Sequence, residues 1–400
     1  MKVVCILSDA LRHDYIEKMD FLKKMSNEKY YIKKIKPGLG FCEISEYVTG
    51  MDSIKNENVF QITFNNKFSS IEGKVKILSK LNNFMGSIPK VRKYTDKIIS
   101  KYVETDKFYV DTNEIKRVRY NIPLELLKYF KPTESYYKYD DNNFFFEKNI
   151  FNDMKKSNIS YDIDNFVEHN KIKGTDEERL ENLRKKINTK SLKDFTLLYI
   201  GYGELAHVLG TKDIKFNHIL KQYDLKLKSI YDDLINQYDN DACLVILGDH
   251  GMVDVEKYIN INKNIDEICK KNNLIKGNDI VYFIDSTFVR IWIKDKSKVE
   301  NIERELKNEY LNDIEPIEFD DRIKSIYGDI IIMLKPGKVF FPDFFNRKKI
   351  KGMHGYSNEI CEQQGMMLIL GESIKKSAYN NLHLHEAKDI LLSLLKNSVI

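Results

Sequence analysis

The chain has 400 residues, and its 65 lysines and arginines nearly balance 60 aspartates and glutamates, leaving a formal net charge of +5. This balance argues against a protein built mainly to coat nucleic acid, and a hydrophobic content of 42% excludes a disordered chain. No apolar run approaches the roughly 18 residues of a membrane span. Five scattered cysteines without a CxxC pair are typical of a reducing compartment, so we expect a cytoplasmic protein.

Short apolar strands alternate with helical segments along the chain. The first strand, Val3–Leu7, runs directly into Ser8 and Asp9, and a helix is expected over Tyr15–Asn27. Further strands are expected at Ile32–Ile35, Val59–Phe64, Phe195–Ile200, Ala242–Leu247 and Gly365–Leu370, and further helices over Asn217–Asn236 and Glu386–Leu395. This alternation predicts an α/β fold with a doubly wound, mostly parallel sheet flanked by helices.

Two segments interrupt this alternation. Residues 66–190 are rich in Lys, Asn and Tyr, and residues 276–334 contain two strands within Asp279–Ile293 followed by a helix over Lys296–Glu309. We therefore predict a core in three parts, an inserted cap and a small α+β insertion. The predicted core parts are 1–65, 191–275 and 335–400, the cap is 66–190, and the small insertion is 276–334.

Acidic residues and histidines gather just past the predicted strands. They are Asp9, Glu204 with His207, Asp249 with His250, and the glycine-flanked His354. Each pattern alone is also explained by a turn with a capping acid and a surface histidine. Because ligands of open α/β sheets sit at the carboxyl ends of strands, the four patterns together indicate a site for divalent metal ions.

The same segments resemble the alkaline phosphatase superfamily, and most of all its nucleotide pyrophosphatase/phosphodiesterase branch. The matching pieces are ILSDALRHDYI, PGLGFCEISEYVTG, YGELAHVLG, VILGDHGM and KGMHGYSNE, in this order along the chain. The resemblance implies an alkaline-phosphatase-like core. It also implies two divalent metal ions a few ångströms apart, usually zinc, with manganese or magnesium as alternatives.

The resemblance also implies how the ligands divide between the two ions. Asp9, Asp249 and His250 would hold one ion together with the nucleophile, and His207, His354 and a nearby acid would hold the other. In relatives this acid lies four residues before the histidine, a position that is Gly203 in this chain. The nearest acid is Glu204, which is the candidate ligand or else a helix-start acid.

The resemblance places the nucleophile at the start of the helix that ends in Thr49-Gly50. Cys42 is the leading candidate and Ser45 the alternative, since zinc coordination would ionise a thiol. A third interpretation is that the nucleophile position is empty at Gly40 and a water molecule attacks instead. The sulfatase maturation pattern Cys-x-Pro/Ala-x-Arg is absent, which argues against formylglycine.

We therefore predict a phosphodiesterase or nucleotide pyrophosphatase that cleaves a phosphoester or pyrophosphate bond by two-metal in-line attack. The substrate would be a small anionic molecule such as a nucleotide, a sugar nucleotide or a phosphorylated glycan, with no nucleic-acid partner. The same fold also accommodates a phosphomonoesterase, a sulfatase-like esterase or a phosphotransferase. A different class is a degenerate member that binds metal and an anion with little turnover.

Overall fold

The computed structural model describes residues 1–64, 122–123, 126, 129–133, 139–140, 149–164, 175–346 and 348–396. The chain divides into two compact units. Unit 1 comprises the described residues of Met1–Gln61, Glu134–Val255 and Lys351–Ile400, and unit 2 those of Ile62–Thr133 and Glu256–Ile350. The range 66–190 contributes to both units, but much of it lies outside the described residues, so the predicted cap boundaries stay a prediction.

Unit 1 is built on a seven-stranded sheet. Its strand order is β16 (Ser377–His383), β2 (Tyr30–Lys36), β15 (Gly365–Leu370), β7 (Ala242–Leu247), β1 (Lys2–Ser8), β6 (Phe195–Ile200) and β5 (Tyr161–Ile163). The central strand β1 pairs in parallel with both β6 and β7, whereas β15 runs antiparallel to β7 and β2. The predicted doubly wound, mostly parallel sheet is therefore confirmed.

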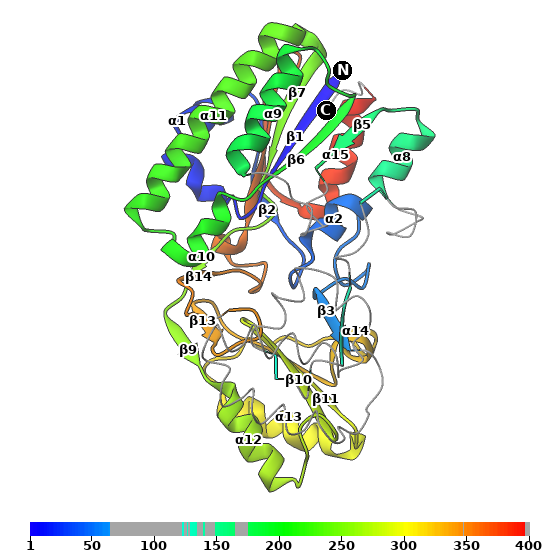
Figure 1. Cartoon of the computed structure of the whole chain (residues 1–400), viewed down its shortest axis with the longest axis vertical. Coiled ribbons are helices and arrows are strands. Elements are labelled where there is room, and N and C mark those ends of the chain that lie inside the picture. The colour runs from blue at the N-terminus through cyan, green and yellow to red at the C-terminus, as the bar shows by residue number, and fades with distance from the viewer. Residues whose placement is uncertain are drawn as a thin grey trace, which may run out of the picture. The chain divides into compact units, whose positions relative to one another are not determined.

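Helices cover both faces of this sheet (Figure 1). Successive side chains of a strand point to opposite faces, and β1 divides accordingly. Val4 and Ile6 pack in one hydrophobic cluster, and Val3, Cys5 and Leu7 in another. The first cluster includes α1 (Asp20–Ser26), α9 (Asp176–Asn188) and α11 (Ile214–Tyr238), and the second α2 (Glu43–Thr49), α8 (Ile150–Lys156) and α15 (Ala387–Leu395). Burial on both sides explains why β1 is a continuous apolar run.

The helix predicted over Tyr15–Asn27 is interrupted at Met19, where the backbone is extended. The 3₁₀ helix η1 (His13–Lys18) precedes the interruption and α1 follows it. The buried carboxylate of Asp224, from α11, accepts the backbone N–H groups of Phe21 and Leu22 at 2.8 and 3.0 Å. Asp224 thus satisfies the first N–H groups of α1 and stabilises a new helix start there.

Several short elements complete unit 1, and some of them carry the residues of the site below. They are η2 (Gly203–Leu205), α10 (Ala206–Leu209), η3 (Asp239–Asp241), β8 (Val253–Asp254), β14 (Gly352–Met353), η5 (Cys361–Gln363) and η6 (Leu384–Glu386). The short strands β8 and β14 pair antiparallel with each other. Among the helices that the structure describes, none is long and apolar enough to cross a membrane.

Unit 2 has its own hydrophobic core around a three-stranded antiparallel sheet, β10–β11–β12. Its strands and helices are β3 (Ile62–Phe64), β4 (Phe130–Pro132), β9 (Lys257–Ile259), α12 (Ile261–Lys271), β10 (Ile280–Asp285), β11 (Phe288–Ile293), η4 (Lys296–Lys298), α13 (Val299–Glu309), α14 (Asp321–Tyr327), β12 (Ile330–Met333) and β13 (Lys338–Phe340). The two strands and the helix predicted between 279 and 309 are confirmed. The strand predicted at Val59–Phe64 is shorter, because the carbonyl of Val59 accepts the N–H of Phe41 instead.

Candidate metal centre

The carboxyl ends of three neighbouring parallel strands carry most of the predicted site residues. Asp9 directly follows β1, Asp249 and His250 follow β7, and the segment after β6 carries Glu204 and His207. Because β1 pairs in parallel with both β6 and β7, these strand ends lie at the same edge of the sheet. His354, just past β14, completes the set in unit 1.

His250 lies at the centre of this set. Its Nε2 is 3.1 Å from Asp9 Oδ1 and 3.9 Å from Asp249 Oδ1. Its Nδ1 lies 2.8 Å from the carbonyl oxygen of Gly251. Because a carbonyl only accepts hydrogen bonds, Nδ1 carries a proton and donates, so Nε2 is the ring nitrogen that faces the carboxylates and that a bound cation would engage.

His207 is oriented in the same way. Its Nδ1 donates to the carbonyl oxygen of Gly352 at 2.7 Å, and its Nε2 lies 3.3 Å from Glu204 Oε1. Metal-binding histidines usually donate their second ring nitrogen to a carbonyl or carboxylate, which fixes the ring and the tautomer. Both rings therefore have the arrangement that an imidazole ligand needs.

The shift of the acid from position 203 to Glu204 has a steric reason. A Cβ atom at Gly203 would lie 2.3 Å from the carbonyl oxygen of Asp9 and 2.6 Å from that of Ala10. Residue 203 therefore has no room for any side chain, and an acid there would displace the loop that carries Asp9. The neighbouring Glu204 reaches His207 instead.

Two carboxylate oxygens of the ligands predicted from the sequence are buried without a hydrogen bond. Asp9 Oδ2 accepts the hydroxyl proton of Tyr199 at 2.6 Å, but Asp9 Oδ1 has no hydrogen bond and only faces His250. Glu204 Oε1 likewise has none and only faces His207. Buried polar atoms are nearly always satisfied in folded proteins, so such oxygens point to a missing partner.

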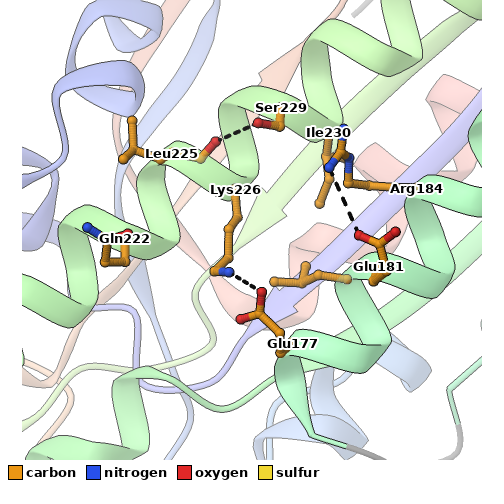
Figure 2. A pocket seen from close by; sticks show the side chains of 9 residues that line it. Glu177, Glu181, Arg184, Gln222, Leu225, Lys226, Ser229 and Ile230 are labelled. Atoms are coloured by element: carbon orange, nitrogen blue, oxygen red, sulfur yellow. Dashed lines mark hydrogen bonds and ion pairs between the residues drawn. The ribbon is translucent and has the colours of Figure 1, made fainter.

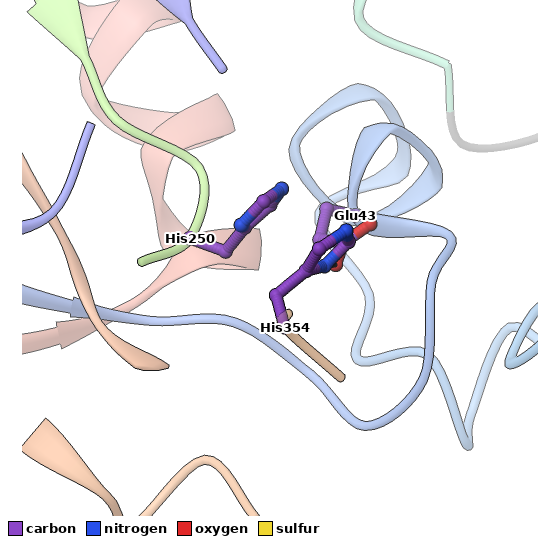
Figure 3. A group of neighbouring side chains, drawn as sticks. All are labelled: Glu43, His250 and His354. Carbon is purple, nitrogen blue, oxygen red and sulfur yellow. Dashed lines mark ion pairs between the residues drawn. The ribbon is translucent and has the colours of Figure 1, made fainter. Parts of the chain in front are cut away.

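His354 and Glu43 bring a third element to the site. The ring of His354 stacks on that of His250 with centroids 3.9 Å apart and an interplanar angle of 10°. Glu43, the first residue of α2, has its Oε1 3.5 Å from His354 Nδ1. Figure 3 shows these three side chains converging, with Glu43 entering from α2. Sequence reasoning missed Glu43, because an acid in the first helical turn is ordinarily explained by the helix dipole.

The pKa values reflect this crowding. Burial raises the pKa of Asp249 well above its usual range, and the neighbouring His250 offsets this only in part. Burial opposes a charge on His250, but Asp249 and the other carboxylates raise the pKa of His250 well above its usual value. Burial lowers the pKa of His354, and the charge of His250 lowers it further. Burial would also raise the pKa values of Glu43 and Glu204, but the charges of the neighbouring histidines lower both. Acids and imidazoles thus compensate for one another in part, and Asp249 is the acid whose charged form a bound cation would favour most.

Three groups of side chains in the described part of the chain place their ligand atoms within 4.8 Å of one another. They are Glu204 with His207 and His354, Asp9 with Glu204 and His250, and Glu43 with His250 and His354. The first group is one of the two ligand sets expected from the sequence. Asp249 lies beside these groups, where its Oδ1 accepts the N–H groups of Ala10 and His250 at 3.2 and 2.9 Å.

None of these groups in the described residues contains a predicted nucleophile. Cys42 is the buried N-cap residue of α2, and its thiol makes no capping hydrogen bond. The Ser45 hydroxyl donates to the Cys42 carbonyl at 2.7 Å and accepts from Asn56 at 3.1 Å. At Gly40 a Cβ would lie 1.9 Å from the carbonyl of Val59, so this position cannot hold a side chain. The nucleophile assignments stay predictions.

A groove between α9 and α11 is a separate feature of unit 1. Figure 2 shows its charged lining, in which Lys226 pairs with Glu177, and Arg184 lies 4.0 Å from Glu181. Arg184 also donates to Asp233 at 2.7 Å. These charges pair with one another, and the groove contains none of the predicted site residues. We therefore place the functional site at the sheet edge.

Comparisons with known proteins agree with this geometry. The family model described as type I phosphodiesterase/nucleotide pyrophosphatase matches residues 82–357, which is more than half of the chain. A search among curated proteins finds no match.

Solved structures share the fold at low sequence identity. Human ectonucleotide pyrophosphatase/phosphodiesterase 5 is 14% identical, with a TM-score of 0.66 over 100% of this chain and 96% of that chain. Murine ectonucleotide pyrophosphatase/phosphodiesterase 5 is also 14% identical, with a TM-score of 0.64 over 99% of this chain and 95% of that chain. An inactive form of the murine protein in complex with AMP gives a TM-score of 0.63 at 14% identity, with the same coverage. The chain belongs to the type I phosphodiesterase/nucleotide pyrophosphatase family of the alkaline phosphatase superfamily.

Proposed function

We propose that this chain is a metal-dependent hydrolase that cleaves a phosphoester or pyrophosphate bond of a small anionic substrate. The observation that carries the proposal is the convergence of three histidines and several acids at one edge of the sheet in unit 1. Two of the rings, His207 and His250, already donate Nδ1 to a backbone carbonyl and present Nε2 to the site. A structural cluster of charges would not require that orientation.

The residues present fit divalent metal ions. Asp9 Oδ1 and Glu204 Oε1 are buried oxygens without a hydrogen bond, and each faces an imidazole nitrogen. Mixed imidazole and carboxylate donors favour zinc over magnesium, which prefers oxygen ligands and water. We propose that Glu204, His207 and His354 hold one ion, and that Asp9, Asp249 and His250 hold the other. Bound ions of this kind neutralise phosphoryl oxygens and lower the pKa of a nucleophile.

The surrounding residues keep these ligands in place. The Tyr199 hydroxyl fixes Asp9, and Asp249 Oδ1 ties the loop after β7 to the backbone of Ala10. The carbonyls of Gly251 and Gly352 hold the two rings. Because none of these contacts needs to move when substrate binds, the site is preorganised for charge that develops on a phosphoryl group.

Cys42 remains our proposed nucleophile, with Ser45 as the alternative. The Ser45 hydroxyl donates to the Cys42 carbonyl and accepts from Asn56, which argues against Ser45 as the attacking group. A comparison of Cys42→Ala with Ser45→Ala tests the assignment. Full activity in Cys42→Ala would overturn it and favour direct attack by water.

The substrate class follows from the family and one solved relative. The murine phosphodiesterase 5 structure contains AMP, so a nucleotide is the first substrate to test, followed by sugar nucleotides and phosphorylated glycans. With a net charge of +5, the chain as a whole attracts anions only weakly. Recognition of phosphate would therefore depend on the bound ions rather than on overall charge.

The decisive experiment combines metal content with turnover. We expect close to two zinc ions per chain, hydrolysis of bis-p-nitrophenyl phosphate in preference to the monoester and the sulfate ester, and at least a roughly 100-fold loss in His250→Ala. Loss of activity on chelation and recovery with zinc would support metal dependence. A single metal ion with no turnover on any of the three esters would favour a degenerate binding protein instead.

A further inference from the structure

Glu43 is a buried carboxylate without a structural partner for one of its oxygens. The side chain belongs to a residue only 7% exposed, and its Oε1 has no hydrogen bond. The nearest imidazole nitrogen, His354 Nδ1, lies 3.5 Å away. Burying a carboxylate in this state is costly unless a positive group compensates for the lost hydration.

A second acid of the same helix shows the contrast. Glu46 is 1% exposed, and its Oε2 accepts the backbone N–H of Gly38 at 2.9 Å. This bond closes the loop that leads into α2, which gives Glu46 a structural task. Glu43 Oε1 is instead directed into the histidine cluster, as Figure 3 shows.

The position of Glu43 makes its carboxylate a further candidate ligand for the metal centre. Its ligand atom lies within 4.8 Å of those of His250 and His354, and His354 is also shared with Glu204 and His207. Because we propose that His250 and His354 hold different ions, Glu43 lies within reach of both, and imidazole with carboxylate is a typical donor set for zinc. All of these donors belong to unit 1.

We propose that Glu43 is a metal ligand that α2 contributes to this centre. The helix on which the family resemblance places a nucleophile would then supply a carboxylate donor as well. This inference rests on the proposed function, because it requires that the centre binds metal. It goes beyond that function because Glu43 lies outside the four patterns of acids and histidines from which the sequence predicts the metal site.

The test is a metal titration of the full chain, followed without any substrate. Wild type, Glu43→Gln and the matched control Glu46→Gln are stripped by chelation and titrated with Co²⁺, with visible absorption and elemental analysis as readouts. We expect Glu43→Gln to bind at least one ion at least about tenfold more weakly and with an altered absorption spectrum. Glu46→Gln should be less stable but should keep the affinity and spectrum of wild type.

A second variant guards against a folding defect. Glu43→Asp keeps the charge but shortens the reach, so it should lie between wild type and Glu43→Gln in affinity. Circular dichroism checks that each variant is folded. If Glu43→Gln or Glu43→Asp matches wild type in affinity and spectrum, the ligand role is wrong while the proposed function stands. If wild type itself binds no metal, the proposed function fails and the inference fails with it.

Discussion

The two units each bury charged side chains, but they satisfy them in different ways. In unit 2, Asp285 Oδ2 accepts from Arg290 Nε at 2.5 Å, and Arg290 Nη1 donates to the Ile62 carbonyl at 2.6 Å. Asp343 nearby accepts from the backbone and side chain of Asn346 at 2.5 and 2.7 Å. In unit 1, Asp9 and Glu204 each keep a buried oxygen without a hydrogen bond.

The difference separates a structural network from a binding centre. A buried carboxylate with fixed partners stabilises one conformation, whereas one that lacks a partner is tolerated only if something else compensates for it. At the sheet edge of unit 1, burial also raises the pKa of Asp249 well above its usual range, so a bound cation would favour its charged form, whereas Asp285 is already paired with Arg290. Mutations should consequently affect the two units in opposite ways.

The largest expected effect is on the stability of unit 2. Arg290→Met leaves Asp285 buried without its cation, and we expect a loss of about 3–5 kcal/mol in the free energy of unfolding. Trp292, the single tryptophan of the chain, lies in β11, so its fluorescence during denaturant unfolding reports on unit 2.

The matched control is a surface pair of the same unit. Lys296 lies 2.7 Å from Asp329 with its side chain 65% exposed, and Lys296→Met should cost less than about 1 kcal/mol. Replacing both Asp285 and Arg290 with apolar residues should cost less than Arg290→Met alone. If Arg290→Met and Lys296→Met lower the free energy of unfolding equally, the buried Asp285–Arg290 pair is not a special structural network, and the contrast with unit 1 fails.

A mutation at the sheet edge of unit 1 is expected to have a smaller effect on stability, and one of opposite sign. Burial raises the pKa of Asp249 well above its usual range, so Asp249→Asn removes a carboxylate whose charge is unfavourable there. The variant without metal should therefore unfold at the same or a higher temperature than wild type at pH 7. Zinc at 100 times its dissociation constant should stabilise wild type by about 2.7 kcal/mol, and the variant clearly less. Calorimetry with and without zinc measures both quantities.

The exposed Glu177 in the groove of unit 1 provides the control for that experiment. It pairs with Lys226 outside the centre, so Glu177→Gln should respond to zinc as wild type does. An Asp249→Asn protein that is less stable without metal, and equally stabilised by zinc, would make the sheet edge a structural network like that of unit 2.

The sequence predicts the sheet well because its information is local. β1 and β7 are buried on both faces and therefore appear as short, continuous apolar runs, which periodicity identifies. The break at Met19 is not local. It depends on Asp224, about 200 residues further along the chain, whose carboxylate accepts the N–H groups of Phe21 and Leu22 in the first turn of α1. No pattern within Tyr15–Asn27 could have indicated it.

The site shows the same division. That Asp9, His207 and His250 lie together could be predicted, because each follows a strand and these strand ends meet at one edge. His354 was indicated by its flanking glycines instead. Glu43 could not be predicted, since only the packing of α2 brings it to His354. The reason for glycine at position 203 was equally hidden, as it depends on the carbonyl of Asp9, which lies just past another strand.

The smallest effect concerns a carboxylate of unit 1 that is satisfied but exposed. Asp194 accepts from the hydroxyl and backbone N–H of Ser160 at 2.6 and 2.8 Å, and from Lys2 at 3.0 Å. The hydrogen bond from Ser160 is the main cause that lowers the pKa of Asp194 from 3.8 to about 2. The folded chain therefore holds this proton less tightly than the unfolded chain, so the stabilisation is present above pH 4 and is lost as the pH falls towards 2.

We expect Asp194→Asn to lower the free energy of unfolding by less than about 1 kcal/mol at pH 7, because water screens a side chain that is 40% exposed. The difference from wild type should shrink between pH 4 and pH 2, as measured by denaturant unfolding at several pH values. This sign is opposite to that for Asp249, whose pKa is raised by burial. A difference that grows in acid would mean that Asp194, like Asp249, is destabilised by its surroundings, and its exposure and hydrogen bonds would then not distinguish it from the buried acid.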